Sequence, residues 1–165
     1  MTQITCEQAL QGIRYIIEMH TEEYVQQRIN AVINGLHLVL GDVHDLQQPW
    51  LLKRRTLTAN RMEVLQTQLA LICHYLTEAT RSWGIRQRRC LFSAQHELMK
   101  LIGMYEPRWI QLPHGSAREA RKEATHKGKA IGTLLYQASR VMKELIDADL
   151  LKLCALPHTS YPIAT

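Results

Sequence analysis

The chain has 165 residues, a formal net charge of +5 and a hydrophobic content of 46%. This length fits one domain, which buries roughly 70% of the surface that its unfolded chain exposes. No apolar run approaches the roughly 18 residues that a membrane-spanning helix needs, and the first residues show no secretory signal. We therefore expect a cytoplasmic protein without membrane contact.

The N-terminal third predicts helices followed by a loop. Thr5-Cys6-Glu7-Gln8 is a capping box and opens a first helix, and near residues 21–23 the chain either restarts or continues as a helix. An apolar stripe with spacings of three and four residues follows, formed by Val25, Ile29, Val32, Leu36 and Val39. We expect Gly41-Asp42 to end this helix, and residues 43–52, which contain Pro49 and no period, to form a loop.

The strongest helical period lies in the middle of the chain and reaches about residue 83, with Gly84 as the expected C-terminal cap. Its apolar stripe consists of Met62, Leu65, Leu69, Ile72 and Leu76. A fourth helix is predicted over roughly residues 85–104, and Pro107, Pro113 and Gly115 mark the next loop.

A second capping box, Ser116-Ala117-Arg118-Glu119, opens the terminal helix. Gly128 and Gly132 weaken the prediction that this helix is unbroken, and Pro157 stops it. No repeat and no alternating strand pattern occurs in the sequence, so we predict an all-α, single-domain bundle of about five helices. The apolar stripes then form the core, or one of them pairs with a protein partner or a second copy in a homo-oligomer.

Charge divides this one domain, residues 1–165, into three parts. Residues 1–52 carry six acids and two bases, a net charge of −4, and residues 53–129 carry fifteen bases and six acids, a net charge of +9. The apolar C-terminal helix, expected over residues 130–156, belongs to a segment in which three bases balance three acids. This segregation predicts a polyanionic partner for the basic middle.

The basic side chains form three clusters, which we take as candidate nucleic-acid-binding residues. They are Lys53, Arg54, Arg55 and Arg61; Arg81, Arg86, Arg88 and Arg89; and Arg118, Arg121, Lys122 and Lys129, with Lys127 beside them. Arg118, Lys122 and Lys129 are four and seven residues apart and share one helix face, so this row of cations could follow a phosphate backbone. The backbone amides of the helix start at Ser116 form a further candidate anion site.

Aromatic residues near these clusters suggest how bases could be recognised. Trp50, Trp83 and Trp109 each lie close to a basic residue, an arrangement that single-stranded nucleic acid favours, although tryptophans in helical proteins usually anchor the core. A helix-turn-helix can also be drawn across residues 76–92, with Gly84 at the turn and Ala79, Trp83 and Ile85 at its apolar positions.

Catalytic patterns are sparse. HEPN-type ribonucleases carry an arginine followed, after four to six residues, by a histidine, and four pairs fit: Arg14 and His20, Arg89 and His96, Arg108 and His114, and Arg121 and His126. About two such pairs are expected by chance. The four cysteines form no CxxC pair, so we expect reduced, packed thiols, no metal, no cofactor and no catalytic residue.

Our hypothesis from the sequence is a non-catalytic nucleic-acid-binding protein that contacts the phosphate backbone of DNA or RNA. In architecture it is similar to small helical subunits that brace nucleic acid in nucleoprotein complexes. Two alternatives stand beside it. The chain could be an adaptor or inhibitor that binds an acidic protein, or a HEPN-like ribonuclease.

Overall fold

A computed structural model describes the backbone of residues 5–19, 22–51 and 56–155, and the side chains of 5–12, 22–51 and 56–149. These ranges contain a short 3₁₀ helix, η1, five α-helices and no β-strand. The helices are α1 (Cys6–Met19), α2 (Glu22–Leu51), α3 (Leu57–Thr80), α4 (Gly84–Met104), η1 (Pro107–Trp109) and α5 (Arg118–Ala155). The predicted all-α, single-domain helical bundle is therefore confirmed.

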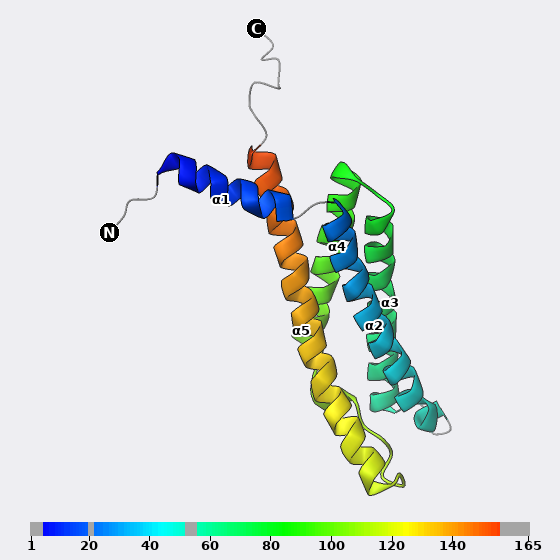
Figure 1. Ribbon diagram of the computed structural model, residues 1–165. Coiled ribbons are helices and arrows are strands. Elements are labelled where there is room, and N and C mark those ends of the chain that lie inside the picture. Colours follow the sequence, from blue (N-terminus) through cyan, green and yellow to red (C-terminus); the bar gives the residue numbers. More distant parts are fainter. Residues whose placement is uncertain (1–4, 20–21, 52–55, 156–165) are drawn as a thin grey trace.

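The bundle is built from antiparallel neighbours. In Figure 1, α2, α3 and α4 run side by side, α5 lies along α4 and α2, and α1 projects from one end and contacts α5. The predicted stripes of α2 and α3 face this core, and α4 and α5 add apolar residues of their own. Among its fully buried side chains are Ile29, Leu36, Met62, Leu65, Leu69, Ile72, Leu76, Leu98, Leu101, Leu135 and Met142.

The first helix begins as its capping box predicts. The Thr5 N–H donates to the Gln8 Oε1 at 3.1 Å, and the Gln8 N–H donates to the Thr5 hydroxyl at 3.3 Å. Each residue thus satisfies an amide that the first helical turn leaves without an intrahelical acceptor.

The second helix is longer than predicted, because neither Gly41-Asp42 nor Pro49 ends it. The expected loop over residues 43–52 is wrong, since α2 continues to Leu51. Val43 and Leu46 extend the buried stripe by another two turns, and their burial outweighs the roughly 1 kcal/mol that a glycine costs inside a helix. Pro49 lies in the last turn of α2, where its missing N–H removes only one hydrogen bond near the end.

Thr56 caps the start of α3, with its hydroxyl accepting from the Ala59 N–H at 3.2 Å.

The connection between α3 and α4 differs from the prediction in two ways. Arg81, rather than Gly84, is the C-terminal cap of α3. Gly84 instead opens α4 with a φ of +60°, a conformation that favours glycine. The helix-turn-helix prediction is also wrong: α3 and α4 pair as an antiparallel hairpin, and Trp83 and Ile85 are 83% and 65% exposed.

The last helix runs unbroken through both glycines. A Cβ atom on Gly128 would lie 2.5 Å from the Pro107 carbonyl oxygen, so glycine is what lets α5 approach η1 this closely. The Tyr105 hydroxyl donates to the Gly128 carbonyl at 2.5 Å and thereby ties the end of α4 to α5. Gly132 lies against the same tyrosine ring. Close packing, rather than a helix break, explains why both glycines stand there.

We predict that Gly128→Ala destabilises the protein by about 1–3 kcal/mol, because the added methyl group overlaps the Pro107 carbonyl and crowds Ile110. Urea unfolding, followed by the circular dichroism of the helices, would measure the loss as a lower midpoint.

Gly41→Ala is the matched control, since a Cβ atom there meets nothing within 4 Å. It should stabilise α2 by roughly 0.5–1 kcal/mol. Equal effects of the two substitutions would contradict the close approach of α5 to η1.

Candidate nucleic-acid interface

The candidate site lies along the contact between α4 and α5, which we call the seam. Three side-chain interactions fix the antiparallel register of the two helices: Arg88 with Asp149 (2.5 Å), Gln95 with the Ser139 hydroxyl (3.3 Å), and Tyr105 with the Gly128 carbonyl (2.5 Å). Because these contacts are spread from one end of α4 to the other, they determine which side chains of α4 and α5 become neighbours at the surface.

A single surface, which we call the outer face, follows from this register. On α4, Phe92 lies beside the seam on the side away from the buried Leu91 and Leu98. On α5, Tyr136 and Lys143 flank Ser139 on the side away from the buried core. Since the core lies on one side of the seam, these opposite sides of both helices face the same solvent. The outer face comprises Ile85, Arg89, Phe92, His96 and Met99 from α4, and Arg118, Lys122, Lys129, Tyr136, Arg140 and Lys143 from α5.

The outer face combines cations with exposed apolar side chains. Phe92, Met99 and Tyr136 are 46%, 51% and 59% exposed. The α5 side is a stripe of exposed positions repeating every three or four residues from Arg118 to Asp147, and Asp147, at its far end, is the one carboxylate among them. The cations of this stripe extend over about 38 Å, the length of the 25-residue rise from Arg118 to Lys143.

The two halves of the bundle carry opposite charge. The helices α2 and α3 together contain six carboxylates and two guanidinium groups, a net charge of −4. The helices α4 and α5 contain twelve basic residues and six carboxylates, a net charge of +6. The positive potential is therefore directed to the α4–α5 side of the molecule.

Four of the predicted binding residues, Arg89, Arg118, Lys122 and Lys129, lie exposed on the outer face. None of them forms an ion pair with another residue in the described part of the chain. Arg118, Lys122 and Lys129 share one side of α5, as their spacing predicted, so their guanidinium and ammonium groups point to solvent in a row.

The structure places five other predicted residues away from the row of exposed cations on the outer face. Arg86 pairs with Glu78 at 3.8 Å, and Arg88 is held in the seam by Asp149. The remaining three are Arg61, half-buried with its guanidinium 5.9 Å from the centre of the Trp109 ring, Arg81, exposed at the α3–α4 turn, and Arg121, half-buried. Lys53, Arg54 and Arg55 lie outside the described residues.

The predicted binding residues leave out the other seven residues of the outer face, among them Phe92, Tyr136, Arg140 and Lys143. The balanced net charge of residues 130–165 concealed Arg140 and Lys143, because a sum does not show that bases and acids occupy different sides of a helix. The sequence does contain a pattern that indicates these residues: Lys129, Tyr136 and Lys143 are seven residues apart, which places all three on one side of α5.

Two of the tryptophans and the predicted anion site at Ser116 are engaged in contacts within the protein. Trp109 is buried, and Trp50 donates its indole N–H to the Gln111 carbonyl at 2.7 Å, so two of the three tryptophans support the fold. At the start of α5, the Ser116 N–H donates to the Pro113 carbonyl at 2.9 Å. That amide is therefore not available to an anion.

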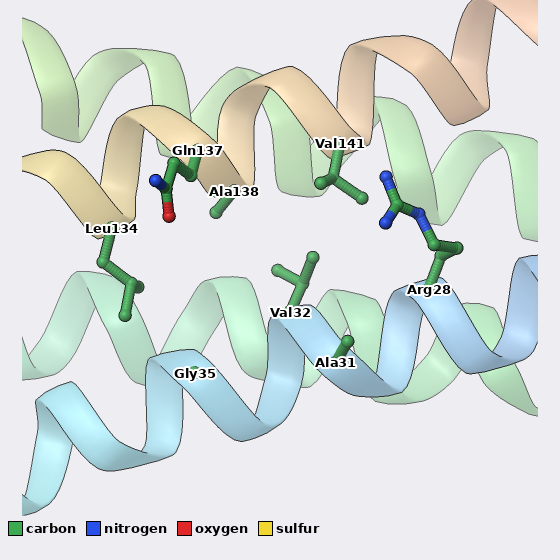
Figure 2. Close-up of a pocket in the computed structure, with 8 residues that line it drawn as sticks. All are labelled: Arg28, Ala31, Val32, Gly35, Leu134, Gln137, Ala138 and Val141. Atoms are coloured by element: carbon green, nitrogen blue, oxygen red, sulfur yellow. The ribbon is translucent and has the colours of Figure 1, made fainter.

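The groove between α2 and α5 offers little chemistry. Figure 2 shows Ala31, Val32, Leu134 and Val141 lining a gap of about 210 Å³, with Arg28 at one end. Arg28 is engaged by Glu144 at 3.3 Å. The space is smaller than the roughly 300 Å³ at which ligand pockets begin, and its lining holds no acid–base pair.

Burial determines the protonation of one thiol in the core. Burial raises the pKa of the Cys73 thiol to about 11, so this thiol stays protonated and unreactive near neutral pH. In the described part of the chain, no three His, Cys, Asp or Glu side chains are placed to hold a metal ion. No helix there is long and apolar enough to cross a bilayer.

Comparison of the chain with protein-family models, curated proteins and solved structures finds no match.

The environments of the cysteines predict selective alkylation in the native protein. In a Cys154→Ser variant treated with iodoacetamide at about pH 8, we expect exposed Cys6 to react readily and buried Cys73 to stay unmodified until the chain is unfolded. Peptide mass spectrometry with and without urea would show this difference. Rapid modification of Cys73 in native protein would contradict the packing of α3.

Proposed function

We propose that this protein is a non-catalytic nucleic-acid-binding protein whose outer face contacts phosphate groups. The observation that carries the proposal is the row of exposed cations on α5, Arg118, Lys122, Lys129, Arg140 and Lys143, interrupted by no carboxylate until Asp147. Cations spaced along a helix can each neutralise a phosphate and release its condensed counterions, which drives binding.

The division of charge supports the same proposal. A net charge of +6 on α4 and α5 against −4 on α2 and α3 orients the molecule as it approaches a polyanion, and the acidic side is repelled. The acidic side is then available to a protein neighbour, which suits a small subunit or regulator of a nucleoprotein complex. Both DNA and RNA present the phosphates that this arrangement requires.

Two alternatives make different demands on the same residues. An acidic protein partner would use the cations of the outer face without any nucleic acid copurifying, which the absorbance ratio of untreated protein at 260 and 280 nm would reveal.

A ribonuclease would need an arginine and a histidine together. Arg121 and His126 are five residues apart, about 140° around α5, and Arg121 is half-buried, so this pair is poorly suited to share a substrate. Arg89 and His96 do lie on the same exposed side of α4, so this alternative rests on that pair. Intact RNA after incubation with the protein would exclude it.

Removing three cations from the outer face should weaken binding and flatten its salt dependence. We expect the triple variant Lys129→Ala, Arg140→Ala, Lys143→Ala to reduce the slope of log affinity against log salt by about 2–3, because each lost phosphate contact removes about 0.7–0.9. Fluorescence anisotropy of a labelled oligonucleotide, measured from about 50 to 200 mM salt, gives both affinity and slope.

The matched control removes three cations elsewhere, with Arg81→Ala, Arg86→Ala and Lys127→Ala. Arg81 and Arg86 lie at the α3–α4 turn, and Lys127 pairs with Asp42 at 3.6 Å toward α2. Net charge falls equally, but the slope should stay near that of the unmodified protein. Equal losses in both variants would assign the effect to net charge alone, and an affinity insensitive to salt would sink the proposed function.

A further inference from the structure

We infer that the ligand of the outer face is single-stranded nucleic acid, with Phe92 and Tyr136 as platforms on which unpaired bases stack. This inference rests on the proposed function and deepens it, since phosphate contacts alone do not distinguish a single strand from a duplex. It requires aromatic rings that are exposed, unengaged and flanked by cations.

Both rings are exposed and unengaged. Phe92 is the one phenylalanine of the chain, and it is 46% exposed on α4 rather than packed in the core. Tyr136 is 59% exposed, and its hydroxyl forms no hydrogen bond with any described residue. Because about half of the Phe92 surface is exposed, the fold gains only part of the roughly 1.5–3 kcal/mol that a fully buried phenylalanine contributes. What an exposed ring offers instead is a flat apolar surface.

At least one cation flanks each ring along its helix. Arg89 lies about one turn before Phe92, and the polar His96 lies about one turn after it. Arg140 lies one turn after Tyr136, while Lys129 and Lys143 lie two turns before and after it. The Ser139 hydroxyl donates to the Met99 sulfur at 3.1 Å, which places the two rows side by side across the seam. Bases can then stack on the rings while phosphates meet the neighbouring cations, which is how single strands are bound without sequence preference.

The same geometry disfavours a duplex and a membrane. In a duplex the bases are stacked on one another, so Phe92 and Tyr136 would find no base to contact, and with α4 and α5 packed flat against each other neither helix stands out to enter a major groove. Insertion into a lipid surface needs a continuous apolar face. On α4, however, Arg89 and His96 separate Ile85, Phe92 and Met99.

The test compares four labelled probes with the full-length protein: a single strand of roughly 15 nucleotides, its duplex, an abasic strand of equal length, and anionic phospholipid vesicles. We expect the single strand to bind most tightly. Phe92→Ala and Tyr136→Ala should each weaken single-strand binding roughly five- to a hundredfold and leave abasic-strand binding unchanged.

Matched variants separate stacking from other causes. Tyr136→Phe keeps the ring and should retain binding, whereas Phe92→Leu keeps an apolar side chain without a ring and should lose it. Trp83→Ala removes an aromatic ring that is 83% exposed at the α3–α4 turn, more than two helical turns from Phe92, and should weaken binding less than Phe92→Ala does. A single cooperative thermal transition in each variant confirms that the bundle is intact, and because both rings are about half exposed, the alanine substitutions should lower the midpoint only slightly.

Three results would overturn the inference: equal affinity for single strand and duplex, equal affinity for the base-bearing and abasic strands, or an effect of Phe92→Ala confined to vesicles. The first two leave salt-dependent binding of nucleic acid, and therefore the proposed function, in place. The proposed function itself fails only when no nucleic acid binds in a salt-dependent manner.

Discussion

The register of α5 against α4 is the constraint on which the rest of the structure depends. Tyr105 reaches the Gly128 carbonyl at one end and Arg88 reaches Asp149 at the other. A displacement of α5 by one residue would rotate its side chains by about 100° and take Tyr136 and Lys143 away from Phe92. The absent side chain of Gly128 thus helps to fix the composition of a surface far along the helix.

Fold and candidate site depend on different sides of the same helices. The core uses the inner sides of α4 and α5, including Leu98 and Met142, while Phe92, Met99 and Tyr136 on the outer face stay about half exposed. The net charges of −4 on α2 and α3 and of +6 on α4 and α5 show that charge is segregated by layer, although α3 belongs to the basic middle of the sequence. This separation allows the outer face to vary in charge without loss of the core.

The sequence was sufficient for the helices and insufficient for how they associate. Local signals such as the Thr5 capping box and the Met62–Leu76 stripe act within one helix, and the structure has both. The prediction that Gly41 ends α2 is wrong because burial of Val43 and Leu46, a tertiary effect, overrides a local preference. The predicted basic clusters group residues that are close in sequence. In the structure, Arg86 and Arg88 pair with carboxylates. Arg140 and Lys143 join the row of cations because the turn of the helix places them on its side of α5. Which helices become neighbours depends on long-range packing, which periodicity does not reveal.

A ligand on the outer face would also act on the fold. Contacts to Phe92 on α4 and Tyr136 on α5 exist together only while the seam is closed, so a ligand that bridges them binds the native state and stabilises it. The seam interactions of Arg88, Gln95 and Tyr105 do not reach the outer side of either helix. Substitutions that weaken the seam should therefore lower both the free energy of unfolding and the affinity for the ligand. Substitutions of an outer-face cation should lower the affinity and leave the free energy of unfolding nearly unchanged. The two kinds of substitution thereby separate the part of the binding free energy that comes from contact with the ligand from the part that comes from the preformed surface.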